Sequence, residues 1–386
     1  MIYFRKILNL FSFILARIIL LFVQIGKRKN RTNTILITRL DSIGDYILFR
    51  NFLKILKNSK KYKDYSITLC GNIIWKDIAK TFDSGIANDF IWIDRKKFYS
   101  NMFYKYKILK NIYKRGFEVA IDSAYNREIL YSDIIIKASA ANKKIGSSGS
   151  LDKHAVWKRK LFSNSFYDLL IEQADENLFE FNRNKEFFEK VLEEKISITK
   201  PELNLSDVET GLKLPQKYIV VFPGSKDAKK RWDVQSYAKI CEYIISKFSL
   251  PIVIPVSGGE KYIALKIINK VQSDKLIDLS GKTNLIQLAK IISDSELLIS
   301  NDTAAIHISA AVDKQFLCIS DGSFIGRFLP YPQEIFSEGN YLFPAEVIND
   351  IQRSDKLSSG YRYNSSIDIN SITVDTVKEK IKELLN

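Results

Sequence analysis

Two loops in the sequence carry side chains whose type and spacing could bind a phosphorylated ligand. In 223-PGSKDAKKRW-232, a glycine and a serine follow an apolar run, and four cations stand just before a tryptophan. A cationic loop leading into a helix can hold a diphosphate, because lysines supply charge and free backbone N–H groups supply geometry. A solvated surface loop would show the same run of charges, so this segment alone leaves both interpretations open.

The second loop, 301-NDTAAIH-307, follows the apolar run 296-ELLIS-300. Asp302 and Thr303 can cap a helix that begins here, which is the simplest explanation of both residues. The small side chains that follow allow a ligand or a neighbouring helix to approach closely. His307 lies one helical turn further along, where it could face a ligand or simply pack.

A third segment, 38-TRLDSIGD-45, places carboxylates on a turn between an apolar run and a helical pattern. A glycine at such a turn is typical of phosphate sites, since the positive end of the helix points outward there. Asp41 and Asp45 would repel a phosphate. We interpret Asp41 as a turn residue, and Asp45 could cap the helix.

These loops follow short, nearly continuous apolar runs that alternate with helical patterns. Such alternation predicts parallel sheets covered by helices on both faces, with ligands bound beyond the carboxyl ends of the strands. The predicted fold class is therefore α/β, with two Rossmann-like domains facing a cleft. The first series of predicted strands is 34–38, 66–70, 90–93 and 118–122, and the second is 218–223, 251–256, 276–280, 296–300 and 316–320.

Composition narrows the class of partner. The 386 residues carry a formal net charge of +15, which favours an acidic partner such as a nucleic acid, an anionic membrane or a phosphorylated substrate. No nucleic-acid-binding pattern is present, so we expect no nucleic acid. The three cysteines are far apart and there are only two histidines, which predicts neither a disulfide framework nor a metal site.

The N-terminus is apolar and basic. Residues 7–25 are mostly apolar, and 27-KRKNR-31 follows them, but no small-residue cleavage site indicates a signal peptide. Arg17 near the middle is costly for a membrane span, so we favour a helix lying on a membrane surface. A spanning anchor and a helix packed on the first domain remain the alternatives.

The order of these motifs resembles the heptosyltransferases of glycosyltransferase family 9, bacterial enzymes that build the inner core of lipopolysaccharide. The resemblance covers about residues 33–330. It is strongest at 42-SIGD-45, 224-GSKDAKKRW-232, 280-SGKTNLIQLAK-290 and 301-NDTAAIH-307. It implies the GT-B fold, and with the N-terminal pattern it predicts four parts. These are a membrane-associating helix (1–31), an acceptor-binding domain (32–200), a nucleotide-sugar-binding domain (201–360) and a C-terminal crossover helix (361–386).

The resemblance also implies roles for individual residues. Asp45 matches the proposed catalytic base, which would explain a carboxylate on this turn, since it would face a neutral hydroxyl rather than a phosphate. Lys230 matches the lysine that holds the donor diphosphate. The implied donor-binding residues are Gly224, Ser225 (near the phosphates), Lys230, Glu260 (at the ribose), Thr283 (near the adenine), Asp302 (on the heptose hydroxyls), Thr303, Ala304 and His307. Cations that could meet a phosphorylated acceptor are Arg127, Lys153, Lys158 and Arg159.

The predicted function is inverting transfer of heptose from ADP-heptose to a core sugar of a lipid-linked acceptor, at the cytoplasmic face of the inner membrane. The chain has no D-x-D triplet, so we expect neither a metal nor another cofactor. Two departures leave the donor sugar open: Ala304 stands where the family usually has glycine, and 320-SDGSFIGRFLPYP-332 replaces its Phe-Gly-x-Thr segment. The alternatives are a family 9-like transferase with another nucleotide sugar in capsule or O-chain assembly, and a non-catalytic, membrane-bound sugar-nucleotide-binding protein.

Overall fold

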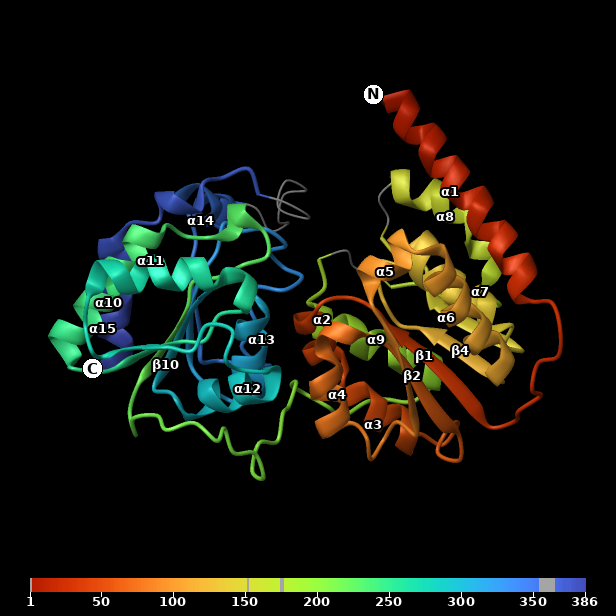
Figure 1. Ribbon diagram of the computed structural model, residues 1–386, viewed down its shortest axis with the longest axis horizontal. Coiled ribbons are helices and arrows are strands. Elements are labelled where there is room, and N and C mark those ends of the chain that lie inside the picture. Colours follow the sequence, from red (N-terminus) through yellow and green to blue (C-terminus); the bar gives the residue numbers. More distant parts are fainter. Residues whose placement is uncertain (1, 151–152, 174–176, 354–364) are drawn as a thin grey trace. The chain divides into compact units, whose positions relative to one another are not determined.

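The computed structural model describes residues 2–150, 153–173, 177–353 and 365–386, with side chains from residue 12 onward and, in the helix after residue 152, from residue 156. The chain divides into two compact units. Unit 1 comprises Met1–Glu176 and Asn182–Ile198, and unit 2 comprises Asn177–Phe181 and Thr199–Asn386. Each unit is built around one parallel sheet, as the alternating pattern predicts (Figure 1).

The sheet of unit 1 has the strand order β3-β2-β1-β4-β5-β6, and every pairing is parallel. All four predicted strands of the first series are confirmed, while the last two strands of the sheet carry too few apolar residues to stand out in the sequence. The strands are β1 (Thr34–Arg39), β2 (Ser66–Asn72), β3 (Asp89–Ile93), β4 (Val119–Asp122), β5 (Lys143–Ser147) and β6 (Leu169–Ile171). The helices are α1 (Ile2–Val23), α2 (Ile43–Phe49), α3 (Asn51–Asn58), α4 (Lys76–Phe82), α5 (Arg95–Ser100), α6 (Met102–Arg115), α7 (Ile134–Ser139), α8 (Lys153–Phe162) and α9 (Glu180–Leu192).

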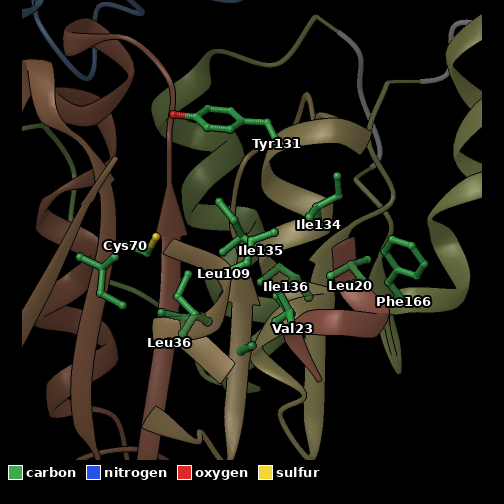
Figure 2. Close-up of a cluster of buried hydrophobic side chains, with 14 of the residues drawn as sticks. Leu20, Val23, Leu36, Cys70, Leu109, Tyr131, Ile134, Ile135, Ile136 and Phe166 are labelled. Carbon is green, nitrogen blue, oxygen red and sulfur yellow. The ribbon is translucent and has the colours of Figure 1, made fainter. Parts of the chain in front are cut away.

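The N-terminal helix α1 is part of the core of unit 1. Four of its side chains, Ala16, Ile19, Leu20 and Val23, are buried among residues of α6, α7 and the sheet (Figure 2). Arg17 turns to the protein, where its guanidinium donates to the carbonyl of Phe162 at 3.2 Å and lies 4.6 Å from the ring centroid of Phe166. The alternative of a helix packed on the first domain is thus realised for this face of α1. In the described part of the chain, no helix has both the length and the apolarity that a membrane span requires.

Unit 2 repeats the plan, with the order β12-β11-β10-β7-β8-β9 and parallel pairings throughout. Its strands are β7 (Ile219–Phe222), β8 (Ile252–Ile254), β9 (Leu276–Asp278), β10 (Leu297–Asn301), β11 (Phe316–Ile319) and β12 (Gly339–Leu342), the first five of which were predicted. Its helices are α10 (Val234–Phe248), α11 (Lys261–Val271), α12 (Leu285–Asp294), α13 (Ala304–Ala311), α14 (Ala345–Arg353) and α15 (Val374–Leu385). Figure 1 shows α10 and α15 on one side of β10, and α12 and α13 on the other.

The C-terminal helix α15 packs within unit 2. Its buried Val377 and Ile381 belong to the same apolar cluster as Tyr237 and Ile244 of α10. The sequence predicts a segment that crosses back to the first domain, whereas the buried side chains of this helix complete the core of the second unit.

Candidate active site

Both sheets have a topological switch point, where successive strands leave in opposite directions from the first strand. In unit 1 it lies between β1 and β4, and in unit 2 between β7 and β10. Neighbouring loops diverge there and leave a crevice at the carboxyl ends of the strands, which is the usual ligand position in such sheets. The turns 38–45, 223–232 and 301–307 begin at the ends of β1, β7 and β10, so the fold places the three predicted loops at the switch points.

Asp45 lies in the first turn of α2, directly after β1. Its Oδ2 accepts a hydrogen bond from the backbone N–H of Ser42 at 3.2 Å, so the carboxylate closes the start of the helix as anticipated. Asp45 is only partly buried, so it keeps access to solvent. A partly exposed carboxylate is suited to accept a proton from a bound hydroxyl.

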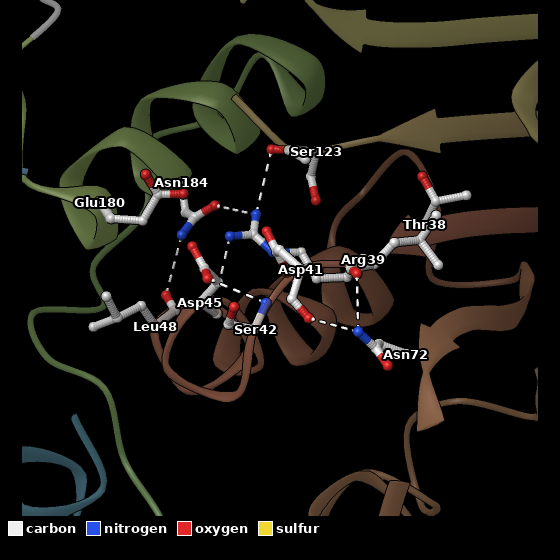
Figure 3. Close-up of polar contacts among 12 residues, drawn as sticks. Thr38, Arg39, Asp41, Ser42, Asp45, Leu48, Asn72, Ser123, Glu180 and Asn184 are labelled. Carbon is white, nitrogen blue, oxygen red and sulfur yellow. Dashed lines mark hydrogen bonds and ion pairs between the residues drawn. The ribbon is translucent and has the colours of Figure 1, made fainter. Parts of the chain in front are cut away.

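A buried arginine holds the turn that carries Asp45 (Figure 3). Arg39 has no exposed surface, and it donates to Asp41 Oδ1 and to Asn184 Oδ1 at 3.0 Å each. It also reaches the carbonyl of Asp45 at 3.4 Å, while Asn72 of β2 donates to the carbonyl of Asp41 at 3.2 Å. Asp41, interpreted from the sequence as a turn residue, therefore neutralises the arginine under the turn.

Sequence reasoning missed Arg39 and Asn184. The signal for Arg39 was available, because a cation at the end of a buried strand must have a partner. Asn184 offered no signal, since it lies in α9, 145 positions after Arg39 in the sequence.

Two of the predicted acceptor cations are structural. Arg127 is buried and donates to Asp133 Oδ1 at 3.0 Å, while Tyr167 donates to the same oxygen at 2.6 Å. Arg159 is also buried and donates to the carbonyl of Ser150. Neither guanidinium can meet an acceptor from these positions, which corrects the prediction for both.

Of the other two predicted acceptor cations, Lys158 is exposed on α8, as a ligand-contacting cation must be. The side chain of Lys153 lies outside the described residues.

Asn301 ties the two switch-point loops of unit 2 together. Its Nδ2 donates to the carbonyls of Pro223 and Gly224, at 2.8 and 3.2 Å. Its Oδ1 accepts from the backbone N–H of Trp232 and from the hydroxyl of Tyr237. All four hydrogen-bonding positions of this buried amide are used, so the end of β10 and the cationic loop after β7 form one rigid piece.

Lys230 and Asp302 form an ion pair between the two switch-point loops of unit 2. Burial lowers the pKa of Lys230, but the carboxylates of Asp302 and Asp321 outweigh it and leave the pKa above its ordinary value, so the ammonium stays charged. The ring of Phe324 lies 5.0 Å from the ammonium. The sequence places these charges 72 positions apart, and the fold joins them where a diphosphate and a sugar could bind side by side.

The segment 320–332, which departs from the family pattern, contributes directly to this region. Asp321 and Phe324 lie near Lys230, and the hydroxyl of Tyr331 is 2.8 Å from Nδ1 of His307. His307 is buried, and burial lowers its pKa to about 4, so the imidazole is neutral above that pH. We conclude that His307 shapes the site through Tyr331 and does not carry charge.

Thr303 caps α13, with its Oγ1 accepting from the N–H of Ala305 at 3.3 Å. Ala304 is the first residue of that helix and is partly exposed. A ligand at the N-terminus of α13 would meet its methyl group.

The predicted ribose-binding residue Glu260 lies against Gly224. A Cβ on Gly224 would be only 2.6 Å from Glu260 Oε1, and Glu260 Oε2 accepts from the hydroxyl of Ser257 at 2.5 Å. The loop of Thr283 is adjacent, because a Cβ on Gly281 would lie 3.0 Å from the Cα of Gly258. The loops after β7, β8 and β9 therefore meet, and glycines make the close approach possible.

Replacing Gly224 by alanine is expected to weaken donor binding without unfolding the chain. The backbone of Gly224 is not in the left-handed region, so the new methyl group displaces the flexible Glu260 carboxylate instead of straining the loop. Loss of one charged hydrogen bond predicts an affinity for ADP lower by about tenfold or more, measured by calorimetric titration. Gly259→Ala is the control, since nothing lies within 4 Å of its added Cβ. Equal affinities for Gly224→Ala and Gly259→Ala would contradict this role of Glu260.

Two buried groups should give opposite pH dependences of stability. Burial raises the pKa of Asp122, at the end of β4, from 3.8 to about 6, so the folded state holds this proton more tightly than the unfolded state. Its contribution to stability therefore falls as the pH rises from about 4 to 6. For His307 the folded pKa is below the unfolded value of 6.5, so stability is lost as the pH falls from about 6.5 towards 4.

Single variants should separate these two slopes in thermal unfolding between pH 4.5 and 7.5. Asp122→Asn keeps the shape of the side chain and should be more stable than wild type at pH 7, by at most about 3 kcal/mol for a shift of this size. Asp122→Asn should lose stability more steeply than wild type as the pH falls, since the loss due to His307 is no longer offset by the gain due to protonation of Asp122. His307→Gln should lose less stability than wild type over the same pH range. Identical slopes in all three proteins would refute the assignment.

The model of glycosyltransferase family 9 (heptosyltransferase) matches residues 105–335, which is more than half of the chain. The chain belongs to glycosyltransferase family 9. The matched residues include Lys230, Asp302 and His307, whereas Asp45 precedes them.

Two curated relatives are lipooligosaccharide heptosyltransferase 2 of Haemophilus influenzae, 28% identical over 177 residues, and that of Haemophilus ducreyi, 34% identical over 88 residues. The alignments cover 45% and 22% of this chain, and they span only 49% and 25% of the relatives' lengths.

Solved structures extend the similarity in fold over most of the chain. The family 9 glycosyltransferase of Veillonella parvula has a TM-score of 0.68 at 16% identity, and covers 92% of this chain and 97% of its own. E. coli heptosyltransferase WaaC with ADP has a TM-score of 0.67 at 14% identity, with 91% and 99% covered. E. coli ADP-heptose heptosyltransferase II has a TM-score of 0.62 at 15% identity, with 91% and 98% covered. The likeness supports the predicted architecture of two parallel-sheet α/β domains.

Proposed function

We propose that this family 9 protein transfers heptose from ADP-heptose to a sugar hydroxyl of a lipopolysaccharide or lipooligosaccharide core, with inversion at the anomeric carbon. The observation that carries the proposal is the Lys230–Asp302 pair at the β7/β10 switch point. It sets a cation for a diphosphate beside a carboxylate for sugar hydroxyls. The names of the relatives, which include heptosyltransferases and a structure with ADP, supply the proposed donor.

Binding of the donor would exchange the partners of this pair. A diphosphate oxygen replaces Asp302 on the Lys230 ammonium, and Asp302 turns to accept hydrogen bonds from the sugar. Because Lys230 and Asp302 already neutralise each other, the site is stable without the donor. For the same reason the desolvation cost of donor binding is small.

In the transfer step the acceptor oxygen forms a bond to the anomeric carbon while the bond from that carbon to the diphosphate breaks. The hydroxyl proton passes to the Asp45 carboxylate. The negative charge that develops on the leaving ADP is stabilised by Lys230 and by the backbone N–H groups at the start of the neighbouring helix. These groups replace the charge of a metal, so we propose that transfer needs none.

The decisive experiment is product identification by mass spectrometry, with ADP-heptose and a panel of defined core acceptors. We expect a mass gain of one heptose, release of ADP, and unchanged turnover in the presence of EDTA. Absence of transfer to every acceptor, together with no thermal stabilisation by ADP-heptose, would overturn the proposal.

A second candidate is a family 9 transferase for another nucleotide sugar. Ala304 favours it, because its methyl group stands where a donor sugar would approach the start of α13. Thermal-shift comparison of ADP-, GDP- and UDP-sugars decides between the two, since only the true donor should stabilise the protein strongly. An Ala304→Gly variant that gains binding of ADP-heptose would show that this methyl group selects the sugar.

A further inference from the structure

Helix α1 has two apolar faces, and only one of them is used by the core. Ala16, Ile19, Leu20 and Val23 face the protein. The opposite face carries Ile14, Ile18, Leu21, Phe22 and, just beyond the helix end, Ile25, which are 43% to 69% exposed. Their spacing of three, four and seven residues places them on one side of the helix.

Helix α8 extends this exposed surface. The rings of Phe13 in α1 and Phe162 in α8 lie 4.3 Å apart, and Arg17 donates to the carbonyl of Phe162, so the two helices are joined. Figure 1 shows them side by side. On α8, Val156, Trp157 and Leu161 are 39%, 48% and 63% exposed. We call these eight side chains of α1 and α8, Ile25 included, the outer apolar face.

Exposed apolar residues are concentrated here. In the described part of the chain, 17 large apolar side chains are strongly exposed, and eight of them form the outer apolar face. Unit 2 contributes only three of them, Tyr262 and Leu265 on α11 and Ile348 on α14. A contiguous exposed apolar surface on a folded domain marks an interaction site, whereas single exposed side chains need no explanation.

The charged residues of α1, of α8 and of the segment after α1 are all basic. The first acidic residue of the whole sequence is Asp41, and α8 contains none. Exposed cations flank the face at Lys27, Lys29 and Arg31 after α1, and at Lys158 and Lys160 on α8. A second copy of the chain would bring the same cations against these, which opposes self-association. An anionic surface with an apolar interior complements both features.

We infer that the outer apolar face docks on an anionic membrane surface, with α1 and α8 lying in the interface and their flanking lysines and arginines on lipid headgroups. Arg17 is not part of this contact, because the protein itself binds its guanidinium. The inference does not depend on the proposed function, and it would hold a family 9 transferase beside a lipid-linked acceptor on the cytoplasmic leaflet.

Vesicle binding by the full-length chain tests the inference without any donor or acceptor. The probes are vesicles of phosphatidylcholine alone and of phosphatidylcholine with 30% phosphatidylglycerol, a fraction chosen to be roughly that of an anionic leaflet. We expect sedimentation with the anionic vesicles, weakened by high salt, and little with the neutral ones. The double variant Leu21→Ser/Phe22→Ser should bind the anionic vesicles more weakly than wild type by about tenfold or more. The control variant Leu265→Ser/Ile348→Ser should bind them as tightly as wild type.

Tryptophan fluorescence gives an independent readout. Trp75 and Trp232 are buried and Trp92 is partly buried, so Trp157 is the most exposed of the four. Its emission should shift to shorter wavelength on anionic vesicles, and Trp157→Phe should abolish the shift while preserving sedimentation. Equal binding by Leu21→Ser/Phe22→Ser and wild type would overturn the inference. A vesicle-free dimer of the wild type that dissociates in this variant would also overturn it, because the face would then be a protein interface.

Discussion

Asp45→Asn is expected to reduce the transfer rate by about 10²- to 10⁴-fold, while the affinity for ADP changes little. The asparagine oxygen can still accept the Ser42 N–H, so the start of α2 is preserved and only the proton acceptor is lost. The measurement is kcat with saturating donor and acceptor, alongside calorimetric titration with ADP.

The matched control is Asp77→Asn. Asp77 also lies in the first turn of a unit 1 helix, α4, and it is exposed, so its loss changes the helix dipole interaction but no predicted chemistry. Turnover of Asp45→Asn within about threefold of the Asp77→Asn value would rule out Asp45 as the base.

Lys230→Met is expected to have two separable effects. Removal of the ammonium should lower kcat/KM by about 10²- to 10³-fold, since developing charge on the diphosphate loses its stabilising cation. It also leaves the Asp302 carboxylate without its ion-pair partner in a largely buried position, which should lower the free energy of unfolding by roughly 2–4 kcal/mol.

The double variant Lys230→Met/Asp302→Asn separates stability from activity. Neutralising the second partner should restore most of the lost stability, because no isolated charge remains buried, but it should not restore turnover. The measurements are thermal unfolding and kcat/KM for the two single variants and the double variant, which together form a double-mutant cycle. Lys229 is an exposed lysine of the same loop, so the kcat/KM of Lys229→Met should be near that of wild type. A loss of kcat/KM equal to that of Lys230→Met would mean that only the overall charge of the loop matters.

Much of the fold could be predicted because its strands are buried on both faces. Strands such as 219-IVVF-222 read as uninterrupted apolar runs, and the glycines and acids after them mark the loops. Strand β5 gave no such signal: 143-KKIGS-147 has a single large apolar residue, and its pairing with β4 depends on packing that sequence periodicity does not record.

The candidate site was predictable where its residues follow central strands, as Lys230, Asp302 and Asp45 do. It was not predictable where burial decides the role. Arg127 and Lys158 look alike in the sequence, yet one is paired with Asp133 in the interior and the other is exposed. The partners of Arg39 come from three separate segments, and only the folded chain brings them together.

The N-terminal helix shows a further limit of sequence patterns. Apolar residues all around a helix indicate burial on all sides but do not say whether protein or lipid provides it. The buried cluster shows that protein covers one face of α1, and the other face is the one proposed to contact the membrane.

The end of α1 is fastened to α6 as well as packed on it. Lys110 donates to the carbonyl of Val23 at 2.8 Å, Tyr113 donates to that of Gly26 at 3.2 Å, and a Cβ at Gly116 would collide with the carbonyl of Lys29. A shortened chain that begins after this segment would uncover Leu109, Ile112 and the apolar side of α7. Trimming the N-terminus to obtain a protein free of lipid should therefore yield an aggregating one, and polar substitutions on the outer apolar face are the route to a soluble enzyme.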